Sequence, residues 1–222
     1  MDVRLVSYSR PSPEFANDGV RDCQDLVAYC ARVSNPSNQA NTETSQRLIH
    51  YLIRHQHWSP LEMVNVCVEV TTTRDIARQL LRHRSFSFQE FSQRYADPVK
   101  ELDFELRDAR LQDTKNRQNS ISTDDEALQT EWHRHQEYVI NAARTAYNWA
   151  IQNGIAKEQA RAVLPEGNTV SRLYVNGTLR SWVHYIALRS GNGTQLEHIE
   201  IARACAKVIA EVFPMANDLL AA

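Results

Sequence analysis

A run of alternating valines is the feature that most limits how this chain can fold. Val64, Val66, Val68 and Val70 alternate with side chains of mixed polarity over residues 63–70. Successive side chains of a β-strand point to opposite faces of its sheet, so this spacing places all four valines on one face. The pattern predicts a strand over residues 63–70 whose valine face is buried in a core.

The segment after this strand is expected to form a short helix. Apolar residues recur with helical spacing over residues 76–81, and the hydroxyl of Thr72 or Thr73 is expected to cap the helix by accepting its free amide hydrogens. Residues 85–88 then alternate like another strand. Three arginines recur at every fourth position and therefore share one face of the helix: Arg74, Arg78 and Arg82.

The rest of the chain adds further strands and helices. A start signal at residues 122–126 begins the longest helix, which Gly154 ends. Residues 96–121 are polar without a sustained period, so we expect a long excursion where motions concentrate. The other expected elements are strands at residues 3–8 and 169–175, helices at 20–33, 42–55, 157–164, 179–188 and 196–213, and a loop at 190–193. These patterns predict a single α+β domain over residues 1–222, with a mostly antiparallel sheet flanked by helices.

Composition and cysteine spacing limit the compartment and the partners. Hydrophobic residues make up 42% of the chain and the net charge is only -2, so no field of the whole molecule attracts nucleic acid. The N-terminus has no charged leader before an apolar run, and no stretch approaches the ~18 apolar residues of a membrane helix, so we expect a cytoplasmic protein away from membranes. The four cysteines form no CxxC pair, which favours buried reduced thiols over a metal site or a disulfide.

Positive charge is concentrated in one part of the chain. Residues 82–95 combine cations, hydroxyls, one carboxylate and aromatic rings, and we expect them to bind two anionic ligands. The planar fork of arginine matches phosphate oxygens, and serine hydroxyls can donate to phosphate or carbonyl oxygens. Among these arginines Glu90 would stay ionised and could accept from a ribose hydroxyl or orient an arginine.

Other interpretations of this stretch are open at the level of residue patterns. The arginines could form a solvated helix face, or a nucleic-acid-binding module could place them on backbone phosphates while Phe86, Phe88 or Tyr95 stacks on bases. The same rings could instead belong to the core. A nucleophilic role for Ser92 has little support because no Gly-x-Ser-x-Gly elbow surrounds it. His83 is a poor metal ligand because no partner lies four residues on.

Several blocks of the sequence together resemble one known family. Arg82-His83-Arg84, followed after seven residues by Ser92 and then by Gln93-Arg94-Tyr95, is similar to the signature of the flavin-dependent thymidylate synthases, the ThyX family. Residues 84–92 resemble a branch found in cyanobacteria and large DNA viruses. The likeness extends over most of the chain, through residues 31–34, 57–62, 77–81 and 160–165, the pair Arg180 and Arg189, and Gln195-x-Glu197.

The resemblance implies a fold, a reaction and an assembly. The expected reaction is the reductive methylation of dUMP to dTMP, in which methylenetetrahydrofolate gives the carbon, NADPH gives the reducing equivalents and FAD passes a hydride to the pyrimidine. The expected assembly is a homotetramer of ThyX-like chains with FAD sites between subunits. An inactive relative that binds nucleotide and regulates is the alternative within this family.

The resemblance also implies which residues bind each ligand. Flavin contacts are implied for Ser59, Arg82, His83, Arg84 and Glu90, and from another subunit for Thr178, Leu179, Arg180 and His184. Contacts with dUMP are implied for Gln79, Arg82, Glu90, Phe91, Ser92, Gln93, Arg94, Arg161 and Arg189. Arg189 is the implied catalytic residue, because a fixed cation at the uracil edge favours ionisation of the ring nitrogen.

For some positions the resemblance leaves more than one role open. Ser92 is expected to position the substrate, with direct attack as the alternative. His57 is either a partly buried histidine near a helix end or a residue beside flavin or folate, and Gln195 and Glu197 are interpreted as structural. The chain departs from the usual family pattern at Ser59, where threonine is common, and at Gln89 and Thr178, where asparagine is common.

Overall fold

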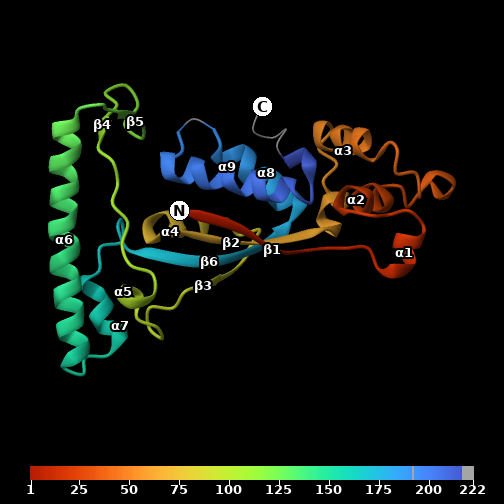
Figure 1. Ribbon diagram of the computed structural model, residues 1–222. Coiled ribbons are helices and arrows are strands. Elements are labelled where there is room, and N and C mark those ends of the chain that lie inside the picture. Colours follow the sequence, from red (N-terminus) through yellow and green to blue (C-terminus); the bar gives the residue numbers. More distant parts are fainter. Residues whose placement is uncertain (192, 217–222) are drawn as a thin grey trace.

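The computed structural model describes residues 1–191 and 193–216, and its centre is a four-stranded antiparallel sheet (Figure 1). The strand order is β1 (Asp2–Tyr8), β2 (Asn65–Thr73), β6 (Val170–Thr178) and β3 (Ser87–Glu90). Strand β2 pairs with β6 along its whole length, from Asn65 opposite Thr178 to Thr73 opposite Val170. The predicted antiparallel sheet is therefore confirmed.

The valine prediction is confirmed on the buried face, although the strand is shifted along the chain. Val64, Val66, Val68 and Val70 are all 0% exposed. The strand begins at Asn65 rather than residue 63 because residues 59–63 form a turn of 3-10 helix with a proline in its first turn. Pairing with the long strand β6 carries β2 on to Thr73, three residues beyond the predicted end.

Helices α8 (Leu179–Arg189) and α9 (Leu196–Ala210) cover the valine face of the sheet, and the short helix α4 (Arg74–Leu80) packs against α9 (Figure 1). The buried indole of Trp182 donates from Nε1 to the carbonyl of Val66 at 3.0 Å, so α8 is tied directly to β2. On the opposite face, alternate side chains of β6 are exposed: Arg172, Tyr174 and Asn176.

Two groups of helices lie at the ends of the sheet (Figure 1). At one end are α2 (Cys23–Ala31) and α3 (Ser45–Arg54), as predicted. At the other end is the long helix α6 (Glu126–Gln152) with α7 (Lys157–Ala160), and the predicted continuation of α7 to residue 164 forms a 3-10 turn instead. The short helix α1 (Pro13–Asn17) was not predicted, because proline was interpreted as a stop although it is tolerated in a first helical turn.

Residues 96–121 carry more regular structure than predicted. They contain helix α5 (Pro98–Glu101) and strand β4 (Arg110–Gln112), which pairs with β5 (Ser120–Ser122). The side chain of Gln129 on α6 anchors this segment, because its Oε1 accepts from the Ala109 amide at 2.6 Å and its Nε2 donates to the Ala109 carbonyl at 3.1 Å. The segment contributes too few residues per element for a periodic pattern to show.

The predicted helix ends are confirmed in one case and wrong in another. Asp125 caps α6 by accepting from the Leu128 amide at 3.0 Å, and Gly154 follows the helix with a φ of 78°. The hydroxyl of Thr73 does not cap α4, because it donates to Asp75 at 2.7 Å. Since α4 ends at Leu80, Arg82 lies beyond the helix and the three arginines do not share one helical face.

All four cysteines are free, and the prediction that they are buried holds for two of them and is wrong for the other two. Cys23 and Cys205 are buried, whereas Cys30 and Cys67 are partly exposed. Of the helices in the described part of the chain, none has the length and apolar character needed to cross a bilayer. The predicted loop at residues 190–193 includes residue 192, which lies outside the described residues.

Candidate active site

A histidine and an arginine from distant parts of the sequence meet where α4 and α8 end. Arg189, the last residue of α8, donates from Nε to Nε2 of His83 at 2.9 Å. Arginine nitrogens only donate, so Nε2 of His83 must be the unprotonated nitrogen of a neutral imidazole. Burial, and then the charges of Arg189 and Arg82, lower the pKa of His83 and keep it in this form. The structure thus brings the predicted catalytic arginine onto the predicted signature motif.

The two arginines that flank His83 carry charge that the protein does not neutralise. Arg82 and Arg84 are both exposed, and neither side chain forms an ion pair with another of the described residues. By contrast Arg74 is only 12% exposed and pairs with Glu90, and Arg78 pairs with Glu166. The interpretation of a solvated arginine stripe is therefore wrong for Arg74. Arg82 and Arg84 remain available for an anionic ligand.

The aromatic rings after this motif pack into the core and do not form a surface on which bases could stack. Phe86 is 7% exposed and its ring lies 4.5 Å from that of Trp182, and Phe88 is half-buried. Gly177 on β6 allows this approach, because a Cβ there would lie 2.3 Å from Cδ1 of Phe86. Phe86 and Phe88 are thus core residues, which removes two of the three rings that a nucleic-acid-binding module would use.

Residues 90–94 lie at the end of β3, on the edge of the sheet. The Glu90 carboxylate accepts from the Ser171 hydroxyl at 2.8 Å and from Arg74 Nη1 at 3.3 Å, so part of it is already engaged. The Phe91 amide donates to the Arg172 carbonyl at 2.8 Å. Ser92 is exposed, and its backbone carbonyl accepts hydrogen bonds from the amides of Tyr95 and Ala96 in a turn. This turn exposes Ser92 and Arg94 and buries Gln93 between them.

Gln93 carries a polar group that the protein leaves without a partner. The residue is 4% exposed, and its Nε2 makes no hydrogen bond within the described part of the chain. A buried donor without a partner costs free energy, which a ligand oxygen would recover. Close by in sequence, Arg94 pairs with Glu158 at 3.4 Å, and Arg161 donates from Nε to the Glu158 carbonyl at 3.3 Å. Two of the arginines expected to contact dUMP are therefore gathered around one residue.

A second group of predicted residues lies around the start of α8. Thr178 caps this helix by accepting from the Ser181 amide at 3.2 Å. The ring of His184 lies 4.3 Å from Trp58, which precedes Ser59, and Arg180 forms an ion pair with Glu62. Ser59 is exposed on its 3-10 turn. These contacts bring the predicted flavin residues of the two segments together.

Two of the predicted site residues on α8 face away from each other. Arg189 lies nine positions after Arg180 on α8. At about 100° per residue this is a rotation of about 900°, or two and a half turns, so the two side chains leave the helix on opposite sides. Leu179 is 0% exposed in the core, which argues against the flavin contact expected for it. His57 is exposed, so its interpretation as a partly buried histidine is wrong. Its role beside flavin or folate stays a prediction.

Behind His83 lies a series of hydrogen-bonded polar side chains that was not predicted from the sequence. Gln79 contacts Gln195, which was interpreted as structural, and also contacts His198, which in turn contacts the hydroxyl of Tyr185. Glu197 is structural as expected, because it pairs with Arg110 at 2.7 Å and ties the β4–β5 hairpin to α9. A signal for His198 existed: it occupies a core position of the helical stripe that continues through Ile201, Ala202 and Cys205.

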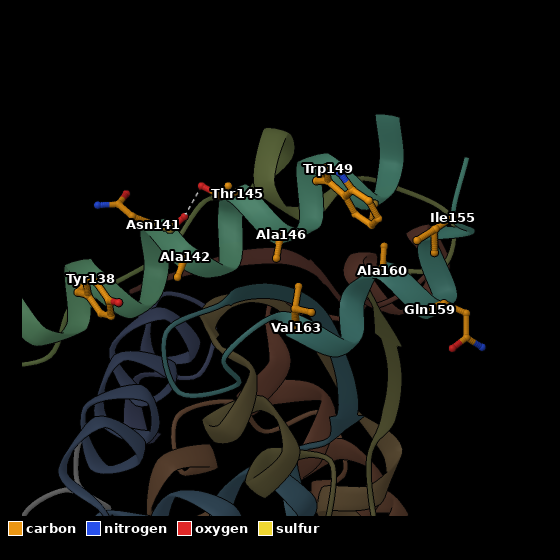
Figure 2. Close-up of a pocket in the computed structure, with 11 residues that line it drawn as sticks. Tyr138, Asn141, Ala142, Thr145, Ala146, Trp149, Ile155, Gln159, Ala160 and Val163 are labelled. Atoms are coloured by element: carbon orange, nitrogen blue, oxygen red, sulfur yellow. Dashed lines mark hydrogen bonds between the residues drawn. The ribbon is translucent and has the colours of Figure 1, made fainter. Parts of the chain in front are cut away.

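A wide groove of about 920 Å³ lies apart from this site, between α6 and α7. Figure 2 shows Ala142, Ala146 and Trp149 of α6 facing Val163 and Ile155 across it. None of the residues that line the groove is charged. It therefore suits an apolar protein surface rather than a phosphorylated ligand. Among the described residues, no three His, Cys, Asp or Glu side chains are placed to hold a metal ion.

The fold and the site together define a class of protein. An antiparallel α+β fold brings free arginine charge, a neutral histidine that holds a further arginine, and an unpartnered buried amide to one edge of the sheet. Such a set of donors and cations fits an anionic ligand of the nucleotide type.

Comparison with known proteins gives the family. The family described as thymidylate synthase complementing protein matches residues 18–215. The chain belongs to this family, that of the flavin-dependent thymidylate synthases. It is 48% identical over 214 residues to a probable flavin-dependent thymidylate synthase of Paramecium bursaria Chlorella virus 1, and 47% identical over 215 residues to a flavin-dependent thymidylate synthase of Synechocystis sp.. Each alignment covers 96% of both chains.

These relatives and a solved structure support the expectations from sequence. A virus and a cyanobacterium are the two sources that residues 84–92 indicated. A crystal structure of a UMP/dUMP methylase PolB from Streptomyces cacaoi bound with 5-Br dUMP superposes with a TM-score of 0.78 at 26% identity. The superposition covers 99% of this chain and 94% of that one. The likeness of fold therefore extends over the whole chain.

Proposed function

We propose that the protein catalyses the reductive methylation of dUMP to dTMP, with methylenetetrahydrofolate as carbon donor, NADPH as reductant and FAD as bound cofactor. The observation that carries the proposal is the contact of Arg189 with a neutral His83, inside a motif flanked by the unpaired cations Arg82 and Arg84. Membership of the family and the close relatives named flavin-dependent thymidylate synthase support the same reaction.

The substrate dUMP fits the donors at the edge of the sheet. Arg94 and Arg161 would hold its phosphate, because both lie around Glu158 and the Arg161 guanidinium donates only to a backbone carbonyl among the described residues. The unpartnered Nε2 of Gln93 would donate to an oxygen of the nucleotide, and the Ser92 hydroxyl would position it. The structure bound with 5-Br dUMP supports a pyrimidine nucleotide as the ligand class.

The residues around His83 fit the diphosphate of a flavin dinucleotide. Arg82 and Arg84 offer exposed guanidinium groups that no described carboxylate neutralises. Thr178, Arg180 and His184 would meet the flavin from another copy of the chain. Ser59, which was expected with Arg82 and His83, follows Trp58, whose ring contacts His184, so we assign it to this second group. When bound, FAD supplies the hydride transfer that no amino-acid side chain can perform.

Arg189 would act on the uracil ring as a fixed cation. His83 holds its Nε, and its two terminal nitrogens make no hydrogen bond to any described residue. They are free to donate to the edge of the pyrimidine, where a cation stabilises the negative charge that develops on the ring. A neutral His83 is required for this arrangement, because a protonated imidazole could not accept the Arg189 hydrogen bond.

This role for arginine removes the need for a thiol nucleophile. Burial raises the pKa of Cys23 to about 11 and that of Cys205 to about 12. Burial also raises the pKa of Cys30 and of Cys67. A nucleophilic cysteine needs the opposite shift, toward a thiolate at neutral pH. The four free thiols also support a reducing, cytoplasmic compartment.

We also infer that four copies of this single-domain chain assemble, with each flavin bound between subunits. Arg180 and Arg189 leave α8 on opposite sides, which supports sites completed by a second chain. The apolar groove of α6 and α7 supplies a surface for such an assembly, because Tyr138 is 76% exposed and Trp149 is 60% exposed beside it (Figure 2).

Light scattering of the purified protein tests the assembly. We expect the mass of four chains, and we expect Ala146→Glu in the groove to reduce both the mass and the flavin content. Ala127→Glu is the matched control, because Ala127 is an exposed residue of the same helix outside the groove. A wild-type monomer that binds flavin in full would contradict shared sites.

The absorption spectrum tests the cofactor. The protein, loaded with FAD, is expected to be yellow and to bleach when NADPH is added. We expect Arg84→Ala to weaken flavin retention, while Arg134→Ala leaves it unchanged, because Arg134 lies on the exposed face of α6 and pairs only with Glu131. A folded protein that stays colourless in excess FAD would count heavily against the proposed function.

A further inference from the structure

We propose that Tyr185 and His198 are positioning residues that fix the orientation of the Gln79 amide toward the nucleotide. Their juxtaposition is a chain of hydrogen bonds from the core of α8 and α9 to the end of α4, directly behind His83. The inference rests on the proposed function, because Gln79 is one of the residues proposed to bind dUMP.

The chain of contacts is continuous, with two buried members and two half-buried amides at its outer end. The Tyr185 hydroxyl lies 3.1 Å from Nε2 of His198, and Nδ1 of His198 lies 3.3 Å from Oε1 of Gln79. Nε2 of Gln79 then donates to Oε1 of Gln195 at 2.8 Å. His198 is 0% exposed and Tyr185 is 1% exposed, so water does not compete for these groups.

The orientation of the Gln79 amide fixes the arrangement of protons along this chain. Oε1 of Gln79 can only accept, so the facing Nδ1 of His198 must carry the ring hydrogen. The ring is neutral, since burial and the charge of Arg189 lower the pKa of His198 to about 4. Nε2 is therefore unprotonated and accepts from the Tyr185 hydroxyl, whose pKa burial raises well above its ordinary value. The phenol hydroxyl thus supplies the donor that Nε2 of this tautomer needs, and the hydrogen on Nδ1 faces the oxygen of the Gln79 amide.

The end of the chain that faces the site is the Gln79 amide. One hydrogen of its Nε2 is used by Gln195, which leaves the other free to donate. A free N–H donor fits a carbonyl or phosphate oxygen of a pyrimidine nucleotide. If the amide rotated by half a turn, it would present an acceptor to that oxygen instead. Tyr185 lies four residues before the end of α8 and acts on the substrate side through this orientation.

The position of the chain argues against a purely structural role. His198 takes a core position on α9 that an apolar residue would fill without the cost of burying an imidazole. Its ring lies 6.3 Å from the ring of His83, so the polar chain ends beside the residue that holds Arg189. His198 contacts Gln79, and the rings of both His198 and Tyr185 pack against His83, so these two side chains lie behind both residues.

The test is a double-mutant cycle on the KM for dUMP in the FAD-loaded protein. We expect Tyr185→Phe to raise KM about tenfold with little change in flavin content, the effect of one lost hydrogen bond. In a Gln79→Ala background the same change should add nothing, because the amide it orients is absent. His198→Asn keeps a donor toward Gln79 and cannot change tautomer, so Tyr185→Phe should also add little in that background.

Tyr147→Phe is the matched control. Tyr147 is a fully buried tyrosine whose hydroxyl has no hydrogen-bond partner in the described part of the chain, so its removal should leave KM unchanged. If Tyr185→Phe raises KM by the same factor in the wild-type and Gln79→Ala backgrounds, positioning through Gln79 is refuted while the proposed function stands. If Gln79→Ala itself leaves KM unchanged, the proposed role of Gln79 in binding dUMP fails, and the inference fails with it.

A measurement on the unchanged protein keeps the proposal testable if a variant does not fold. Nitrogen-15 NMR of histidine distinguishes the two neutral tautomers of a buried ring. We expect His198 to carry its hydrogen on Nδ1. A hydrogen on Nε2 would overturn the proposed direction of the chain.

Discussion

Because the imidazole of His198 is buried, we expect the free energy of unfolding of the protein to depend on pH in a specific way. Asparagine in its place keeps a donor for Gln79 but does not titrate, so the comparison of wild type with His198→Asn isolates the ionisation of this ring. The two proteins are compared at pH 7 and at pH 5. Only the wild type has a His198 imidazole to protonate on unfolding.

The sign and size follow from the two pKa values of the ring. In the unfolded chain the imidazole binds its proton near pH 6.5, whereas in the folded protein its pKa is lowered to about 4. Between these values the unfolded chain binds more protons, so the free energy of unfolding decreases as the pH falls. Linkage over these two pKa values gives a loss of ~2 kcal/mol between pH 7 and pH 5. Almost none of this loss is expected above pH 7.

Urea unfolding at a fixed protein concentration measures this difference. We expect the free energy of unfolding of the wild type to fall by ~2 kcal/mol more than that of His198→Asn between the two pH values. The concentration is held fixed because unfolding of an oligomer depends on it. Equal losses in the two proteins would show that His198 titrates normally in the folded state, which would refute the buried, neutral ring.

Three further changes test other parts of the structure. Arg189→Ala is expected to abolish dTMP formation while much FAD is retained, because the change leaves the unpaired cations Arg82 and Arg84 in place for the flavin; near-normal turnover would remove Arg189 from the catalytic role. Replacement of all four cysteines by serine or alanine should leave dTMP formation in place, since each thiol is held as the unreactive acid, and total loss in a folded protein would reopen a thiol mechanism. Gly177→Ala should lower stability by about 1–3 kcal/mol, because its Cβ would lie 2.3 Å from Phe86, and Phe86→Leu in the same chain should recover part of the loss; an unchanged urea midpoint for Gly177→Ala would contradict the close approach.

Most of the fold could be predicted from patterns within single segments. The valines at positions 64–70 predicted the central strand, because a buried face leaves a period of two in the sequence. The long helix α6 was predicted from its helical period, with a start signal at residues 122–126 that includes its cap Asp125 and with Gly154 at its end. The hairpin of β4 and β5 was not predicted, because three-residue strands held by the side chain of Gln129 leave no period to detect.

The same distinction between local and distant contacts separates the site residues that could be predicted from those that could not. Arg82 to Arg94 could be predicted because the segment concentrates its ligand groups in sequence. The chain from Tyr185 through His198 to Gln79 could not, because it joins residues on three helices that approach only after the sheet has formed. Glu62 as the partner of Arg180 was missed for the same reason, since 118 positions separate the two residues.

The measurement that tests the account most directly is the conversion of dUMP to dTMP by the FAD-loaded protein. The account predicts that dTMP forms when dUMP, methylenetetrahydrofolate and NADPH are all present, and that it is not formed when any one of them is omitted. A folded, flavin-loaded protein that makes no dTMP from the complete mixture, or that makes it equally well without a reductant, would contradict the account.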